Sequence, residues 1–194
     1  AKVVAALERN FWREREKELV DKLHIQATTD QLTGIFNRRV VFDALDEAMD
    51  KANESQDREF TTIMFDIDFF KQVNDTYGHA GGDAVLISFA KLLESEITSP
   101  NIVGRIGGEE FLAILYLNQD QAAEFCKKLI IKINDNTVNF EGIDIKISSS
   151  GGVAFSSETN TSADLTNKAD ERLYEAKKSG RNRFKLIDSE LVGD

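Results

Sequence analysis

The sequence feature that most constrains the fold is a pair of short apolar runs joined by Gly107-Gly108. The runs cover residues 102–103 and 111–115. Two glycines between them predict a β-hairpin, because both central positions of the favoured two-residue turn need φ > 0. Glu109-Glu110 follows directly, and adjacent carboxylates repel each other without adding to a sheet. Two interpretations stay open: a solvated turn, or glycines that let a phosphate-bearing ligand approach the backbone with a metal ion between.

The other helical and strand patterns interleave along the chain. Apolar residues recur at helical spacing, for example at Phe42, Leu45 and Met49, or cluster in short runs typical of strands. The predicted helices cover residues 37–51, 69–77, 84–96, 119–134 and 163–179. The predicted strands outside the hairpin cover residues 60–65, 138–140, 143–147, 153–155 and 184–187, with loops at 53–57, 78–83 and 98–101. At least two connections are hairpins, so we expect an α/β (α+β) fold with a central mixed, mainly antiparallel sheet flanked by helices.

Residues 1–28 contain helix formers and neither Gly nor Pro, which predicts a long N-terminal helix. Its apolar residues recur three or four positions apart, at Val4, Leu7, Phe11, Leu19 and Leu23. Six consecutive charges at residues 13–18 interrupt this seam, so the heptad pattern is imperfect. Two interpretations stay open: a solvated helix, or a dimerising helix that carries a signal from an upstream sensor domain. Because the chain begins at Ala1, we expect it to be a fragment.

The composition narrows the classes of partner. The 194 residues suffice for one domain with an appendage. A formal charge of −10 argues against a nucleic-acid polymer as partner. The single cysteine, Cys126, offers no disulfide and is expected as a buried thiol in a reducing cytoplasm. We find no apolar run of membrane-spanning length and no signal peptide, and expect a cytoplasmic domain whose full-length protein could be membrane-attached.

Asp66 and Asp68 stand two residues apart at the end of a predicted buried strand, so their side chains share a face if the strand stays extended. Burying two carboxylates without partners is unfavourable, and a divalent metal is the simplest partner. Mg²⁺ prefers one or two carboxylates with phosphate oxygens and water, which Asp66, Glu109 and a nucleotide would supply. The alternative is an ordinary strand end in solvent.

Asn74 and Asp83 offer a carboxamide and a carboxylate within one supersecondary unit. The carboxylate can accept from the N1–H and N2–H₂ groups of guanine, whereas adenine would leave it unpaired. Both residues could instead cap helices, and for His79 we favour a structural hydrogen bond. Lys177 and Arg181 lie at the end of the last predicted helix, where they suit the helix dipole or could reach the terminal phosphates of a nucleotide.

Five motifs together make the sequence resemble the GGDEF family of diguanylate cyclases over roughly residues 29–187. They are DQLTGIFNRR at residues 30–39, FDIDFFKQVND at 65–75, GHAGGD at 78–83, GGEEF at 107–111 and ADERLYEAKKSGRN at 169–182. The resemblance implies a fold related to adenylyl cyclase and polymerase palm domains. It divides the chain into a helical linker, residues 1–28, and a cyclase domain, residues 29–190. The implied reaction condenses two GTP into cyclic di-GMP and releases two pyrophosphates.

The same resemblance implies the site residues. The metal ligands are Asp66, the backbone carbonyl of Ile67, and Glu109, with Mg²⁺ as the expected ion and Mn²⁺ as the alternative. The phosphate ligands are backbone amides near Phe69 and Phe70, with Lys71, Lys177 and Arg181. Asn74 and Asp83 would read guanine, while Gly107 and Gly108 would let the nucleotide lie against the hairpin. The expected catalytic residues are Glu109, Glu110 and Lys71.

One half-site would hold one GTP, so the family mechanism requires a homodimer with a two-fold axis, for which residues 1–28 are the natural lever. The chain departs from many family members in lacking an Arg-x-x-Asp product-inhibition motif, since Thr98 and Asn101 occupy its charged positions. We therefore predict no tight feedback binding of cyclic di-GMP there. The rival interpretations are a non-catalytic module that binds GTP or product, a cyclase with relaxed base choice, and a purely structural dimerisation domain.

Overall fold

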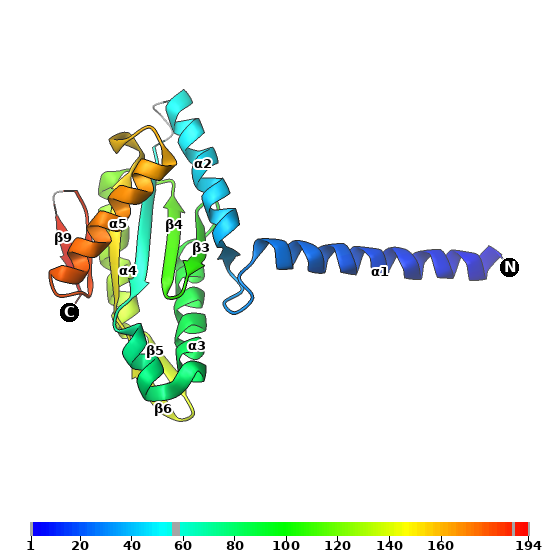
Figure 1. The fold of residues 1–194 in the computed structure, drawn as a ribbon. Coiled ribbons are helices and arrows are strands. Elements are labelled where there is room, and N and C mark those ends of the chain that lie inside the picture. The colour runs from blue at the N-terminus through cyan, green and yellow to red at the C-terminus, as the bar shows by residue number, and fades with distance from the viewer. Residues whose placement is uncertain (1, 56–58, 188, 194) are drawn as a thin grey trace.

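The computed structural model describes residues 2–55, 59–187 and 189–193, with side chains from residue 12 onward. Within these ranges, a seven-stranded sheet is covered by helices on both faces, and a long N-terminal helix projects from it (Figure 1). The helices are α1 (Lys2–Thr28), α2 (Arg38–Glu54), α3 (Phe70–Glu96), α4 (Gln119–Asp135) and α5 (Ser162–Lys178), with a 3₁₀ turn η1 (Ser156–Glu158). The strands are β1 (Phe36–Asn37), β2 (Thr61–Ile67), β3 (Ile102–Gly107), β4 (Glu110–Leu115), β5 (Thr137–Phe140), β6 (Ile143–Lys146), β7 (Ser149–Phe155), β8 (Arg183–Lys185) and β9 (Glu190–Val192).

The sheet is mixed and mainly antiparallel, as predicted. Its strand order is β1-β3-β4-β2-β7-β8-β9. The central pairs β3–β4, β4–β2 and β2–β7 are antiparallel, whereas β1 pairs with β3 and β7 with β8 in parallel. The predicted second hairpin forms a separate sheet of β5 and β6. The edge strands β1 and β9, of two and three residues, were not predicted.

Side chains from both faces of β2 fill two cores. Phe65 points toward α3 and α4, where its ring meets Phe89 edge-on at a centroid distance of 6.5 Å. Met64 points to the opposite face and packs with residues of α2 and α5. Every residue of β2 is buried, which agrees with a strand covered by helices on both sides. Cys126 lies in the first core, where burial raises the pKa of its thiol to about 12, so the predicted buried thiol is confirmed.

The predicted helices α2, α4 and α5 are confirmed within a few residues. Asn37 caps α2 by accepting from the Val40 amide, and Asn118 forms a capping box with Gln121 at the start of α4. Leu45 and Met49 of the predicted apolar face of α2 are buried, whereas Phe42 is only partly buried. The predicted loop at residues 53–57 includes positions 56 and 57, which lie outside the described residues.

The predicted loop at residues 78–83 is wrong. The backbone leaves helical geometry only at Gly78, with φ 72° and ψ 173°, and a second helical segment of α3 continues at once. This segment can begin so early because Gly81 and Gly82 lie against the first segment. A Cβ atom at Gly81 would lie 2.5 Å from Cβ of Tyr77, so only glycine allows this approach. Two glycines that favour a loop locally therefore serve helix packing.

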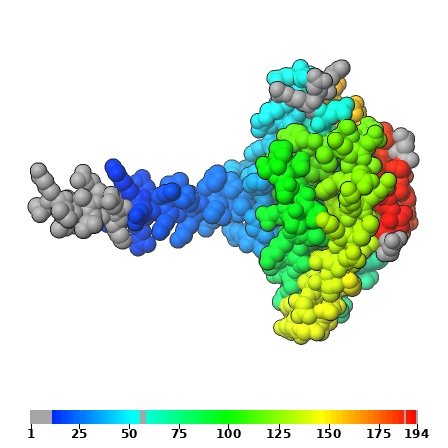
Figure 2. All heavy atoms as spheres, turned by 180° about the vertical axis from the view of Figure 1, so that it is seen from behind, coloured from blue at the N-terminus to red at the C-terminus, as the bar shows by residue number. Residues whose placement is uncertain are grey.

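Helix α1 leaves the body of the molecule, as both overall views show (Figures 1 and 2). Leu19, Val20 and Leu23 are each more than half exposed. The base of the helix is fixed, because Asn37 and Arg39 donate to the carbonyl of Ala27 at 2.9 and 2.8 Å. The side chains of the predicted seam at Val4, Leu7 and Phe11 lie outside the described ones, so the seam stays a prediction. No helix in the described ranges is long and apolar enough to cross a bilayer.

Candidate active site

The end of β2 places Asp66 in the middle of the sheet. The antiparallel register sets Asp66 opposite Glu110 of β4 and Ser150 of β7. Beside it, the Ile67 amide donates to the carbonyl of Glu109 at 3.3 Å. Adjacent strands therefore bring Asp66, Ile67 and Glu109, the residues expected to hold a metal, to one end of the sheet.

Charges of both signs meet at Asp66, which is 6% exposed. Lys177, in the last turn of α5, places its Nζ 2.7 Å from Oδ2 of Asp66. Burial raises the pKa of the Asp66 carboxyl, and Glu109 and Glu110 raise it further, while the Lys177 ammonium opposes the rise without cancelling it. Lys177 thus compensates the buried charge of Asp66 only in part, and a further cation bound here would stabilise the charged carboxylate.

The donor chemistry of this strand end fits a hard divalent cation. Two carboxylates, Asp66 and Glu109, and a backbone carbonyl are oxygen ligands of the kind that Mg²⁺ prefers, and Mg²⁺ commonly completes its shell with water and phosphate oxygens. Among the described residues, no group of three or more His, Cys, Asp or Glu side chains is arranged to hold a metal ion. A metal at Asp66 and Glu109 would need further oxygen ligands, such as a backbone carbonyl, water or a bound phosphate.

The hairpin turn differs from the prediction by one residue. Gly107 belongs to β3 and pairs with Glu110, so the turn consists of Gly108 and Glu109. Gly108 alone has a positive φ, 27°. A Cβ at Gly108 would meet nothing within 4 Å, and at Gly107 only the Glu110 carboxylate at 3.6 Å. A side chain at position 107 would therefore not clash with the described residues. The space beside Gly107 is open, as expected if a ligand lies there.

The start of α3 and the turn after α5 meet beside this strand end. Phe69, the N-cap residue of α3, has a left-handed backbone, and its exposed ring lies under the guanidinium of Arg181 at 4.7 Å. Phe70 is buried in the core, and Lys71 is exposed. The first turn of a helix has amides without intrahelical partners and a partial positive charge. The start of α3 is therefore a suitable anion position, and Arg181 lies beside it on the Phe69 ring.

Asn74 and Asp83 lie close to each other across the break at Gly78. A Cβ at Gly82 would lie 2.0 Å from Oδ1 of Asn74, so this side chain contacts the backbone next to Asp83. Both residues lie inside helical segments, so the alternative that they cap helices is wrong. Asp83 is exposed, and Asn74 is half-buried. Their carboxylate and carboxamide are therefore available to a ligand; His79 is exposed.

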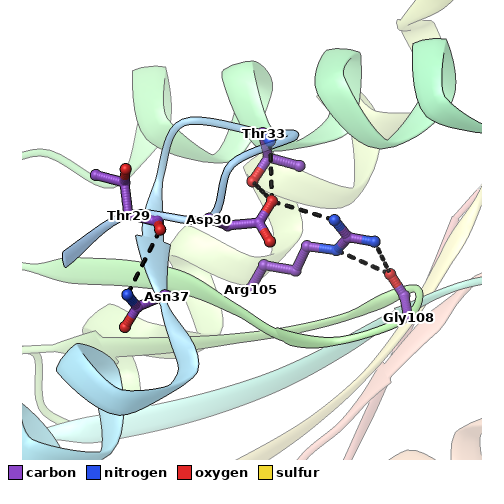
Figure 3. A network of polar contacts seen from close by, with 6 residues as sticks. All are labelled: Thr29, Asp30, Thr33, Asn37, Arg105 and Gly108. Atoms are coloured by element: carbon purple, nitrogen blue, oxygen red, sulfur yellow. Dashed lines mark hydrogen bonds and ion pairs between the residues drawn. The ribbon is translucent and has the colours of Figure 1, made fainter. Parts of the chain in front are cut away.

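Sequence reasoning missed a contribution from Arg105, which links the hairpin turn to the base of α1 (Figure 3). Its Nε and Nη2 donate to the carbonyl of Gly108 at 2.9 and 2.7 Å, and its Nη1 lies 3.1 Å from Oδ1 of Asp30. Burial acts to raise the pKa of Asp30, but hydrogen bonds from Thr33 and Arg105 lower it below its ordinary value. A cleft of about 350 Å³ lies between this network and α2. The only local signal is an arginine two residues before Gly107.

Asp68 has protein partners of its own, which corrects the argument that a metal is the simplest partner for both carboxylates of this strand end. It lies beyond the end of β2 and is 4% exposed. Its carboxylate accepts from the hydroxyls of Ser148 and Ser150 and from the amide of Asn182. These partners satisfy the buried charge without a metal.

Comparison with known proteins assigns the domain that carries this site to a family. The model of the family described as "Diguanylate cyclase, GGDEF domain" matches residues 27–183. Diguanylate cyclase DgcS of Shewanella oneidensis is 36% identical over 170 residues, covering 88% of this chain and 56% of the relative. Diguanylate cyclase A of Treponema denticola is 35% identical over 168 residues, covering 84% of this chain and 45% of the relative. The chain thus spans about half the length of these curated relatives.

A solved structure extends the likeness to the N-terminal helix. The coiled coil and GGDEF domain of DgcB from Caulobacter crescentus, in complex with c-di-GMP, superposes with a TM-score of 0.84 at 27% identity. The match covers 96% of this chain and all of the other. The predicted fold class is therefore confirmed.

Proposed function

The chain belongs to the GGDEF family of diguanylate cyclases, and from this premise we propose that it condenses two GTP into cyclic di-GMP with release of two pyrophosphates. The observation that carries the proposal is the meeting of Asp66, the Glu109 turn and Lys177 at one end of the sheet. Two carboxylates and a lysine there can serve a metal and a phosphate chain together. We further propose residues 1–28 as a signalling linker, residues 29–190 as the cyclase domain, and the cytoplasm, which supplies GTP, as its location.

Members of this family use a divalent metal ion, and we propose Mg²⁺ here, with Mn²⁺ as the alternative. Asp66, the carbonyl of Ile67 and Glu109 would hold it, with Glu110 beside them across the strand pair. When bound, the metal supplies positive charge that makes the 3′-hydroxyl of GTP easier to deprotonate and offsets charge on the α-phosphate. Burial of Asp66 strengthens its attraction for such a cation.

We assign nucleotide recognition to two groups around the metal ligands. Asn74 and Asp83 would read the guanine edge, because a buried base leaves their polar atoms unpaired unless it offers matching donors. The amides of Phe69 and Phe70, with Lys71, Lys177 and Arg181, would hold the β- and γ-phosphates. Fixed cations there act where negative charge grows on the leaving pyrophosphate. Gly107 and Gly108 would leave room for the nucleotide beside the turn.

We propose that two copies of the chain face each other across a two-fold axis, because one half-site holds one GTP. Helix α1 offers exposed Leu19, Val20 and Leu23 for pairing. The imperfect seam would let the pair shift register under a signal from an upstream sensor domain. Leu19→Cys and Leu23→Cys cross-linking can test this, since the one native thiol, Cys126, is buried. A single fixed register in active and inactive states would contradict the shift.

We propose that cyclic di-GMP does not bind tightly at the position of the usual inhibitory motif. Thr98 lacks the guanidinium fork, and Asn101 lacks the carboxylate. Asn101 is already engaged, because its Oδ1 accepts from the Tyr116 amide at 2.9 Å. Calorimetric titration with product is expected to show no tight site in this turn, and sub-micromolar binding there would refute the proposal.

The experiment for the function is chromatography of products from GTP and Mg²⁺ with the parent chain and Glu109→Ala. The parent should form cyclic di-GMP, and Glu109→Ala should form none above background. Glu94→Ala, an exposed glutamate of α3, is the matched control and should behave as the parent. A parent that binds GTP but forms no product would favour the non-catalytic binding module, unless fusion of a dimerising zipper to α1 restores activity.

A further inference from the structure

Asp68 is a buried carboxylate that the proposed chemistry does not use. Its Oδ2 accepts from Ser148 Oγ at 2.8 Å and from the Asn182 amide at 2.9 Å, while its Oδ1 accepts from Ser150 Oγ at 2.7 Å. Its own amide donates to the carbonyl of Ser148 at 2.9 Å. One side chain thus joins the end of β2, the start of β7 and the turn after α5, which are far apart in sequence.

The residues next to these contacts hold an unusual backbone. Phe69, directly after Asp68, has φ 56°, and Arg181 and Asn182 have φ 62° and 48°. Side chains disfavour this left-handed region, so it persists where surrounding contacts fix it. The Arg181 amide donates to Ala176, and its guanidinium lies 4.7 Å from the centre of the Phe69 ring. Asp68 therefore fixes the backbone on both sides of the Arg181–Phe69 contact.

We propose that Asp68 is a positioning residue that, through the amide of Asn182, holds Arg181 where it meets the terminal phosphates of the nucleotide. The inference rests on the proposed binding of GTP. Loss of the carboxylate would free the Asn182 amide and let the left-handed turn relax. The guanidinium would then leave the face of Phe69 and lose its place beside the start of α3.

The test compares binding of GTP and GMP, which share the base and differ by the β- and γ-phosphates. Asp68→Ala is expected to weaken the binding of GTP about 10-fold, which corresponds to the loss of one charge-assisted hydrogen bond, and to weaken the binding of GMP less than about twofold. Arg181→Ala should show the same selectivity, and adding Asp68→Ala to it should change GTP binding no further. Ser150→Ala, which leaves the Asn182 contact in place, is the matched control and should bind both nucleotides as the parent does.

Asp68→Asn covers the case in which the alanine variant does not fold. The single side-chain oxygen of asparagine cannot accept from three donors, so Asp68→Asn should also weaken the binding of GTP more than that of GMP, by a smaller factor than Asp68→Ala. Equal weakening of GTP and GMP in either Asp68 variant, or additive losses with Arg181→Ala, would overturn the positioning role. A parent that binds GTP but forms no cyclic di-GMP even with α1 paired by a fused zipper would overturn the proposed function and leave this comparison intact. A parent that binds neither nucleotide would overturn both.

Discussion

Replacing Gly82 by alanine should separate guanine recognition from stability. The added Cβ would lie 2.0 Å from Oδ1 of Asn74 and 3.2 Å from the tip of Phe70. The closest atom is the end of a flexible side chain, so Asn74 can rotate away at a cost of about 0.5–1.5 kcal/mol. The higher helix propensity of alanine stabilises the folded state by about 1 kcal/mol relative to glycine. The free energy of unfolding should therefore stay within about 1 kcal/mol of the parent, while Asn74 no longer lies beside Asp83.

The expected functional result is weaker binding of guanine nucleotides. Loss of one or two neutral hydrogen bonds, each of about 1 kcal/mol, corresponds to roughly 5- to 30-fold in affinity. Titration calorimetry with GMP isolates this effect, because GMP lacks the β- and γ-phosphates. Asn74→Ala should lose a similar factor, and the double variant with Gly82→Ala should lose no more than either single variant.

Gly81→Ala supplies the structural contrast. Its Cβ would lie 2.5 Å from Cβ of Tyr77, which is attached to the backbone and cannot rotate away. Overpacking of this kind typically costs about 1–3 kcal/mol, so Tm should fall by several degrees. If Gly82→Ala bound GMP like the parent, the assignment of Asn74 to the base would be refuted. If it unfolded as readily as Gly81→Ala, the expected rotation of Asn74 away from the new Cβ would be refuted.

Three other perturbations test the charges at the site. Burial acts to raise the pKa of Asp30, but hydrogen bonds from Thr33 and Arg105 lower it below 3.8, so the charged carboxylate stabilises the fold above that pH. In chemical denaturation, Asp30→Asn should therefore have a lower free energy of unfolding than the parent at neutral pH. This difference should shrink as the pH falls below about 3.8. Burial raises the pKa of Asp66, so its charged form opposes folding at pH 7. Asp66→Asn should therefore raise Tm in metal-free buffer at this pH, and a lower Tm would contradict the reasoning. In the assay with GTP and Mg²⁺, the same variant should form no product. Arg105→Lys should lose the paired bonds to Gly108 and about 1–2 kcal/mol of unfolding free energy, and unchanged stability and product rate would count against the link.

The sequence predicted the elements whose signals are local. Helical periodicity and the caps Asn37 and Asn118 are short-range features, so α2 and α4 lie within a few residues of their predicted bounds. The hairpin was predicted from its apolar runs and glycines. Its turn was placed one residue early, because the irregular register between Arg105 and Gly107 cannot be read from composition. The family itself was predicted from five linked motifs and is confirmed.

The errors concern contacts between distant residues. Gly81-Gly82 favours a loop by local propensity, but the contact of Gly81 with Tyr77 makes glycine the residue that the packed helix needs at position 81. Asp68 resembles a metal ligand beside Asp66, yet its partners lie 80 to 114 positions away in the chain. No local pattern reports those partners. The same holds for the contact of Arg105 with Asp30, 75 positions apart.

The most direct test of the central claim is the rate of cyclic di-GMP formation per chain, measured with GTP and Mg²⁺ over a series of protein concentrations. If two copies each contribute one GTP to a shared reaction, the rate per chain should rise with concentration and then level off as the dimer fills. A rate per chain that stays constant down to the most dilute sample would contradict assembly from separate half-sites. Absence of cyclic di-GMP at every concentration, with α1 paired by a fused zipper, would contradict the cyclase itself.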